Sequence, residues 1–154
     1  MSVASAMKQQ EMARRAEHAF PDPKDDILAK LGDLSHVEIA QNECLIAIYI
    51  RPEKTPGGII LTPLNRKEDE YQGKAGLVVK IGSACRFERT DPKTGVTYGL
   101  PIALHDWIVA RASDTWALDV NANPDILDQK DFVKCRLVYD DQIRMKVPHP
   151  GMIW

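Results

Sequence analysis

Short apolar runs rich in β-branched residues recur from residue 37 onward, and polar turn signals separate them. The run at residues 44–50, Cys-Leu-Ile-Ala-Ile-Tyr-Ile, ends at Arg51-Pro52 and is typical of a buried strand. Five similar runs lie at residues 76–81, 107–110, 115–120, 132–139 and 143–147. Clusters of proline, glycine, asparagine and aspartate between the runs mark turns. This pattern predicts an all-β domain in the form of a small barrel or sandwich.

The first 36 residues follow a helical pattern instead. Residues 2–19 are rich in Ala, Met, Gln, Glu and Arg, which favour helices, and Pro21 and Pro23 stop that helix. A second helix is predicted at residues 24–31, with Gly32 as its C-terminal stop. We therefore expect residues 1–36 to form a short α-helical N-terminal extension with little core of its own.

The remaining boundaries follow from the turn signals. The barrel domain is expected at residues 37–148, with a long loop at 52–73 and a β-hairpin at 83–104 that turns at 92–95. Residues 149–154 are expected to form a C-terminal tail outside the barrel.

The loop at 52–73 carries the most informative residues. Gly57 and Gly58 give a flexible backbone, and Ile59, Ile60 and Leu61 follow as an apolar tripeptide. An exposed apolar tripeptide is unfavourable in a monomer, so a neighbouring subunit, the barrel itself or a binding partner must bury it.

The order of these features resembles the co-chaperonins of the GroES type. The strand at 44–50, Gly-Gly-Ile-Ile-Leu at 57–61 and the strand region at 73–82 follow each other as in the first half of that family. The stretch from His105 to Ala110 is similar to the family's Gly-Asp-Ile-Val strand, and residues 132–147 resemble its closing pair of strands, with an acidic turn before the last one. The resemblance spans roughly residues 44–147 and implies a GroES-like β-barrel.

This resemblance implies that the chain would act as a co-chaperonin that caps a GroEL-like chaperonin ring to assist protein folding. Gly57 and Gly58 would permit the conformation of a mobile loop, and Ile59, Ile60 and Leu61 would bind the chaperonin. Each buried aliphatic side chain contributes about 1.5–3 kcal/mol before the cost of ordering the loop, so one loop binds weakly. A homo-oligomer, heptameric by resemblance, would bind firmly through several loops. The chaperonin hydrolyses ATP in such systems, so no cofactor is expected.

Departures from the family support an alternative function. The chain places about 40 residues before the first strand, its hairpin is longer, and Pro56 and Pro63 stiffen the loop. The tail ends in Met152, Ile153 and Trp154, which are candidates for assembly contacts. An N-terminal arm and an apolar tail suit a bacteriophage virion protein, such as a capsid decoration or cement protein that reuses the barrel and binds the major capsid protein.

Composition narrows the classes of partner. The 154 residues include 20 basic and 22 acidic ones, for a formal net charge of −2, so nucleic acid is not expected as a partner. Cys44, Cys85 and Cys135 are odd in number and lack CxxC spacing, which indicates reduced thiols and neither a disulfide framework nor a zinc site. The sequence shows no secretory signal and no apolar run of membrane length, so we expect a cytoplasmic protein, or a virion component under the alternative, without membrane contact.

The sequence gives little support for an enzyme, and we predict no catalytic residue and no metal ligand. The four histidines lack HxH and HExxH spacing, and P-loop, GxGxxG and GxSxG motifs are missing. The pair His105-Asp106 could serve acid–base chemistry, but a polar pair at a strand edge is the commoner explanation. Trp107 and Trp116 are expected in the core.

Overall fold

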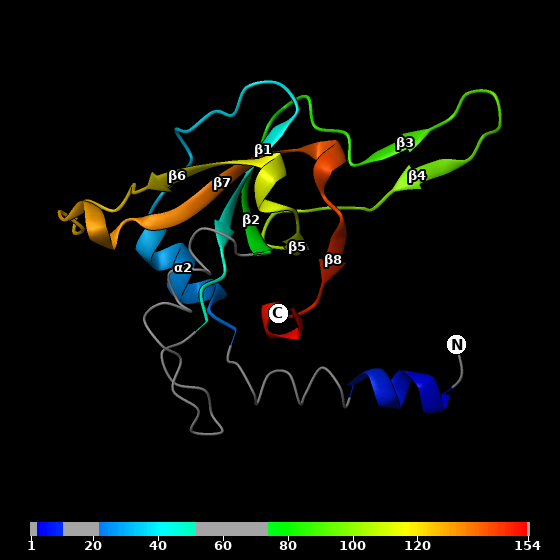
Figure 1. Cartoon of the computed structure of the whole chain (residues 1–154), viewed down its shortest axis with the longest axis horizontal. Helices are drawn as coiled ribbons and strands as arrows, with labels where there is room; N and C mark the ends of the chain where they lie inside the picture. The colour runs from blue at the N-terminus through cyan, green and yellow to red at the C-terminus, as the bar shows by residue number, and fades with distance from the viewer. Residues whose placement is uncertain (1–2, 11–21, 52–73, 154) are drawn as a thin grey trace.

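A computed structural model describes residues 3–10, 22–51 and 74–153 of the chain (Figure 1). Its main element is a six-stranded antiparallel sheet with the strand order β6-β7-β1-β2-β5-β8, and β3 and β4 form a separate two-stranded hairpin. The strands are β1 (Glu43–Ile48), β2 (Ala75–Ile81), β3 (Glu88–Thr90), β4 (Thr97–Gly99), β5 (Trp107–Val109), β6 (Thr115–Val120), β7 (Val133–Tyr139) and β8 (Met145–Val147).

The sheet curls toward a barrel. Asp114 directly precedes the edge strand β6, and Arg144 directly precedes the other edge strand β8. The guanidinium of Arg144 lies 3.6 Å from the carboxylate of Asp114, so the two edges approach each other at this corner. The fold is therefore all-β and barrel-like, as the sequence predicts.

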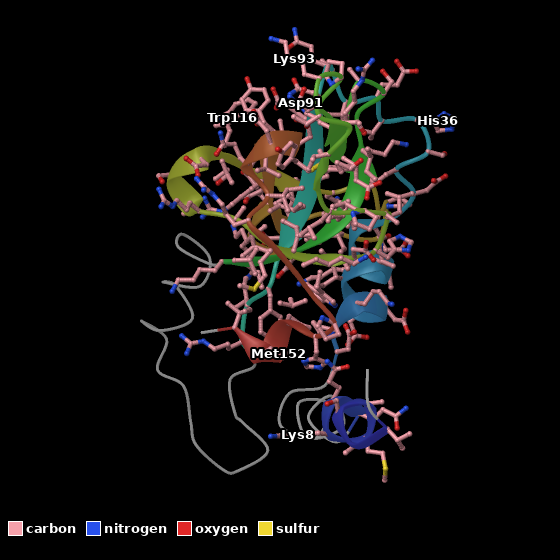
Figure 2. The ribbon with its side chains drawn as sticks, turned by 90° about the vertical axis from the view of Figure 1, so that its right-hand side faces the viewer. Lys8, His36, Asp91, Lys93, Trp116 and Met152 are labelled. Carbon is pink, nitrogen blue, oxygen red and sulfur yellow. The ribbon has the colours of Figure 1, made fainter. Side chains whose placement is uncertain are left out.

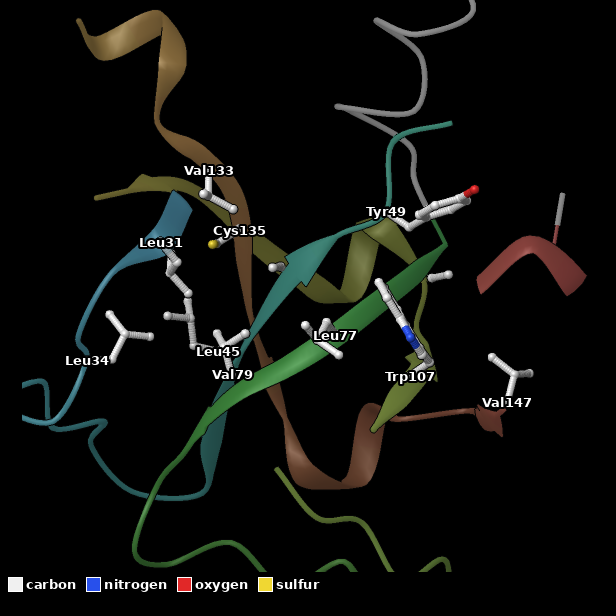
Figure 3. Close-up of a cluster of buried hydrophobic side chains, with 12 residues drawn as sticks. Leu31, Leu34, Leu45, Tyr49, Leu77, Val79, Trp107, Val133, Cys135 and Val147 are labelled. Atoms are coloured by element: carbon white, nitrogen blue, oxygen red, sulfur yellow. The ribbon is translucent and has the colours of Figure 1, made fainter. Parts of the chain in front are cut away.

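The central strands are buried on both faces, which explains their uninterrupted apolar sequence. In β1, Leu45 and Ala47 point into one core, whereas Cys44, Ile46 and Ile48 point into another. The first, here called the helix-side core, also contains Leu77, Val79, Trp107 and Val133 (Figure 3). The second, here called the hairpin-side core, also contains Val78, Ile108 and Val138. Successive side chains of β1 and β2 point to opposite faces of the sheet, so the same two strands contribute to both cores.

Helix α2 (Lys24–Leu31) covers part of the helix-side core. Acidic residues in its first turn and Lys30 in its last turn suit the helix dipole. Leu31 is fully buried and Leu34, just after the helix, is 9% exposed. The predicted helix at 24–31 is confirmed. Because Leu31 and Leu34 complete the core, the second half of the expected N-terminal extension packs as part of the barrel.

The hairpin β3–β4 projects away from the sheet (Figure 1). All six of its strand residues are exposed. Its turn is closed by the Gly95 amide, which donates to the Asp91 carbonyl at 2.8 Å, and by the Asp91 amide, which donates to the Val96 carbonyl at 2.9 Å. The predicted hairpin with a turn at 92–95 is confirmed.

The other predicted elements agree with the structure to within two residues at each end. All six predicted strands are present in the sheet. Of the expected first helix, residues 3–10 are helical, and residues 11–19 lie outside the described residues.

Gly32 offers a test of how α2 is fixed to the barrel. Its φ is +86°, and a Cβ there would lie 2.5 Å from the backbone of Ala122, whose amide donates to the Leu31 carbonyl at 2.7 Å. We expect Gly32→Ala to lower the free energy of unfolding by about 3 kcal/mol or more, because a clash adds to about 1–3 kcal/mol of backbone strain. Gly95→Ala is the matched control, since Gly95 has a φ of +71° but open space around its Cβ position. Urea unfolding of both variants measures the difference, and equal losses would contradict this account of Gly32.

Candidate partner-binding site

The loop with the apolar tripeptide connects two neighbouring strands. Ile48 of β1 pairs with Gly76 of β2, and the Tyr49 amide donates to the Ala75 carbonyl at 2.9 Å. The chain thus leaves β1 and enters β2 at the same end of the sheet. The predicted binding residues Gly57, Gly58, Ile59, Ile60 and Leu61 lie outside the described residues.

The end of the sheet where this loop begins is held by aromatic packing. The ring of Trp107 meets that of Tyr49 edge to face, with centroids 5.9 Å apart (Figure 3). The indole N–H of Trp107 lies 3.4 Å from a carboxylate oxygen of Asp22, a long hydrogen bond. Trp107 is 3% exposed, so its predicted place in the core is confirmed. This packing fixes the strand ends from which the loop starts.

The C-terminal tail folds onto its own barrel. The short helix η4 (Pro150–Met152) begins where the Nδ1 atom of His149 accepts a hydrogen bond from the Gly151 amide at 2.9 Å. His149 is 3% exposed and Pro150 is fully buried. Of the three predicted assembly residues, Ile153 packs against the helix-side core, Met152 is 44% exposed, and Trp154 lies outside the described residues.

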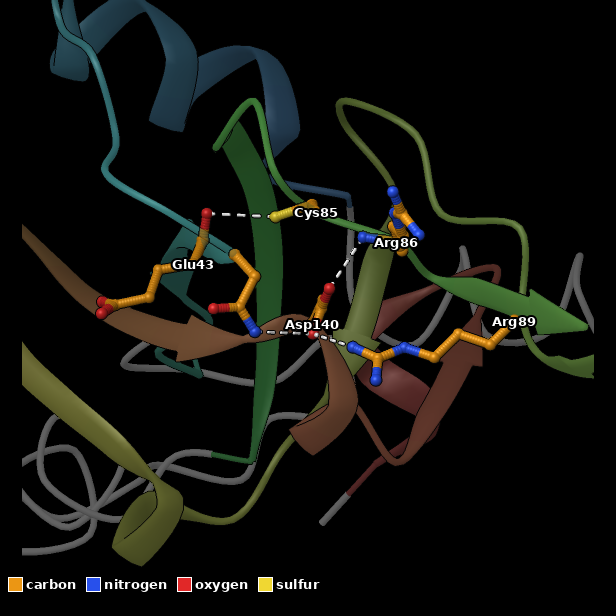
Figure 4. Close-up of polar contacts among 6 residues, drawn as sticks. Glu43, Cys85, Arg86, Arg89 and Asp140 are labelled. Atoms are coloured by element: carbon orange, nitrogen blue, oxygen red, sulfur yellow. Dashed lines mark hydrogen bonds and ion pairs between the residues drawn. The ribbon is translucent and has the colours of Figure 1, made fainter.

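A buried aspartate connects the hairpin to the barrel (Figure 4). The fully buried carboxylate of Asp140 accepts hydrogen bonds from the Arg86 amide at 2.7 Å, from the Asn42 side chain at 3.0 Å and from Arg89 at 3.2 Å. Burial raises the pKa of Asp140, but these hydrogen bonds and the charge of Arg89 outweigh burial and lower the pKa below its usual value. Asp140 belongs to the acidic turn before the last strand, so this turn has a structural role.

His105 occupies a backbone conformation that favours glycine. Its φ is +70°, in the left-handed region, and its amide donates to the Val78 carbonyl at 2.7 Å. The neighbouring carboxylate of Asp106 accepts from the Ala103 amide at 2.8 Å and pairs with Lys146 at 3.1 Å. These contacts explain the pair His105-Asp106 as part of a tight turn into β5.

The three cysteines carry free thiols. Burial raises the pKa of Cys44 and of Cys135 to about 12, and it raises the pKa of Cys85 as well. Such thiols are almost entirely protonated at neutral pH and are weak nucleophiles. In residues 3–10, 22–51 and 74–153, no group of three or more His, Cys, Asp or Glu side chains is placed to hold a metal ion. No helix within those ranges has the length and apolar character needed to cross a membrane.

The prediction that Trp116 lies in the core is wrong, because its side chain is 68% exposed. Trp116 belongs to the edge strand β6 and pairs with Leu137 of β7, which covers it from one side only. Leu137 is half-buried, and Tyr139, two residues further along β7, is 46% exposed. These three side chains, here called the Trp116 patch, line a hollow of about 490 Å³. No sequence signal identifies β6 as an edge strand, so this patch could not be predicted from the sequence.

In comparisons with known proteins, no protein family and no curated sequence matches this chain.

Asp140 generates a pH-dependent prediction. Because its pKa is lowered in the folded protein, its contribution to stability is complete above the unfolded-state pKa of about 3.9 and is lost as the pH falls through the lower folded-state value. We expect Asp140→Asn to reduce the free energy of unfolding at pH 7 by about 1–3 kcal/mol, since it removes an acceptor from buried donors. Urea unfolding at pH 7 and pH 3 should show this difference narrowing in acid.

Asp141→Asn is the matched control, because Asp141 is adjacent and exposed. It should leave the stability at pH 7 nearly unchanged. A constant gap between wild type and Asp140→Asn at both pH values would contradict the assignment.

Proposed function

We propose that this protein is a GroES-like co-chaperonin that binds a chaperonin ring through the segment Gly57 to Leu61. Support comes first from the architecture. The tripeptide stands between two strands that pair with each other, so both ends of its loop are anchored in the best-buried part of the sheet. A loop anchored in this way can present an apolar segment without disturbing the barrel.

The observation that carries the proposal is the backbone of His105. The stretch beginning at His105 resembles a family strand that begins with glycine, and glycine is the residue that tolerates a positive φ. His105 has a φ of +70°, so the position at which the resemblance places the family's glycine has a backbone conformation that glycine favours. The left-handed conformation costs a residue other than glycine roughly 1 kcal/mol, so few such residues adopt it. Its occurrence at His105 therefore supports the resemblance to a strand that begins with glycine.

Binding would depend on several copies acting together. Three aliphatic side chains give a modest free energy once the ordering of the loop is subtracted. When several loops belong to one oligomer, each later contact becomes intramolecular and the total affinity rises. Each single contact still breaks quickly, which suits a cap that must be released.

The charge substitution Ile60→Asp tests this function. It should leave the barrel folded and abolish capture of chaperonin in a pull-down with nucleotide, because a charged side chain is costly to bury in an apolar groove. Leu127→Asp is the matched control, since Leu127 is 91% exposed in another loop, and it should bind as wild type does. Deletion of residues 57–61 should match Ile60→Asp. Undiminished binding by either loop variant would reject the proposal.

A virion structural protein is the second candidate, and one observation favours it. The helix at residues 3–10 exposes Val3 and Met7, at 77% and 63%, although an isolated helix of this length is unstable in water. A helical arm with exposed apolar residues is suited to binding adjacent subunits in a capsid lattice.

Truncation tests this second candidate. Removal of residues 1–21 spares α2 and the core and should prevent incorporation into particles, as judged from the composition of purified virions. Removal of residues 152–154 spares the buried Pro150 but also removes Ile153, which packs against the helix-side core. Urea unfolding of this truncated chain therefore accompanies the incorporation test. Normal incorporation of both truncated chains would exclude an assembly role for these segments.

A further inference from the structure

The Trp116 patch is an uncovered continuation of the helix-side core. Leu45 of β1 pairs with Leu137 of β7, which in turn pairs with Trp116 of β6, so the three side chains share one face of the sheet. Leu45 is 2% exposed, whereas Trp116 is 68% exposed. The same apolar face therefore runs from a fully buried strand to an open edge.

The rim of this hollow is acidic. Glu43 lies opposite Tyr139 on the same face, and Asp114 also lines the hollow. Within the described part of the chain, the carboxylate of Glu43 has no ion pair, and Asp114 reaches Arg144 only at 3.6 Å. An occupant with an apolar face and a positive charge would complement this site.

The helix at residues 3–10 has these properties. Val3 and Met7 are four residues apart and share one helix face. Lys8 follows directly and, among the described residues, forms no ion pair. The helix has a length of about 12 Å, given a rise of roughly 1.5 Å per residue. Its apolar pair and its lysine match the apolar floor and the acidic rim of the Trp116 patch.

The helix and the patch of one chain lie at opposite ends of the molecule. Figure 2 shows Lys8 at one end and Trp116 near the other, and Figure 1 likewise separates the N-terminal helix from β6. We infer that the helix at residues 3–10 docks on the Trp116 patch of a second copy of this chain, with Lys8 beside Glu43.

This contact is separate from the loop of the proposed function. Along β1, Glu43 marks the end of the strand near the Trp116 patch, whereas Ile48 marks the end from which the loop starts. Self-association and partner binding can therefore occur at the same time. Loss of partner binding would leave self-association intact, whereas loss of self-association would weaken partner binding, because firm binding needs several loops in one oligomer.

Sedimentation of the full chain tests the inference. Wild type should be an oligomer at micromolar concentration, and Trp116→Asp and Met7→Asp should each raise the dissociation constant at least tenfold. Leu127→Asp, an exposed leucine outside the patch, should leave the mass unchanged. Deletion of residues 1–10, of which the described residues 3–10 belong to neither core, provides a second variant if Trp116→Asp unfolds. A monomeric wild type, or an oligomer that survives this deletion, would overturn the inference.

A mixing experiment identifies the two surfaces. The Trp116→Asp chain keeps an intact helix, and the Met7→Asp chain keeps an intact patch. Each variant alone should be monomeric, and an equimolar mixture should form a heterodimer through the one remaining helix–patch contact. The exchange Lys8→Glu with Glu43→Lys should restore an oligomer that either single change weakens. A mixture that stays monomeric, or a charge exchange without recovery, would show that the helix does not occupy this patch.

Discussion

The structure depends on the burial of β1 and β2 on both faces. Consecutive residues of β1 enter opposite cores, so neither face of the central sheet can be left to solvent. Helix α2 and the tail cover one face, and the segments at the base of the hairpin cover the other through Cys85, Phe87 and Ile102. These peripheral elements have little stability of their own, and they are ordered because each completes an apolar core that the strands begin.

Polar contacts then fix the directions of the covering elements. The carboxylate of Asp140 is satisfied by three donors from two separate segments, and this removes the cost of burying its charge. The backbone bridge between Gly32 and Ala122 holds α2 in a similar way, because the position leaves no room for a side chain. In both places, hydrogen bonds or close backbone contacts fix the orientation of a peripheral element relative to the sheet.

Two features of the chain bear on the proposed function and on the inferred self-association. In the sequence, an apolar tripeptide falls between the two best-buried strands, and in the structure an apolar patch with an acidic rim lies at the β6 edge. Under the proposed function, separate sites for a partner and for a second copy of the chain would combine weak single contacts into firm binding. This arrangement suits a ring-shaped cap, and it also suits a subunit of a capsid lattice.

The secondary-structure elements and the fold class could be predicted from the sequence. The apolar run of β1, the turn at 92–95 and the stop at Gly32 are local signals, and local backbone preferences are readable from neighbouring residues. Three features became visible only in the folded chain: β6 is an edge strand, Trp116 is exposed while Trp107 is buried, and Ile153 packs on its own chain. Both tryptophans begin or lie within similar apolar runs, so their sequence surroundings do not distinguish them. Exposure depends on which strands become neighbours, and that is fixed by contacts between residues far apart in the chain.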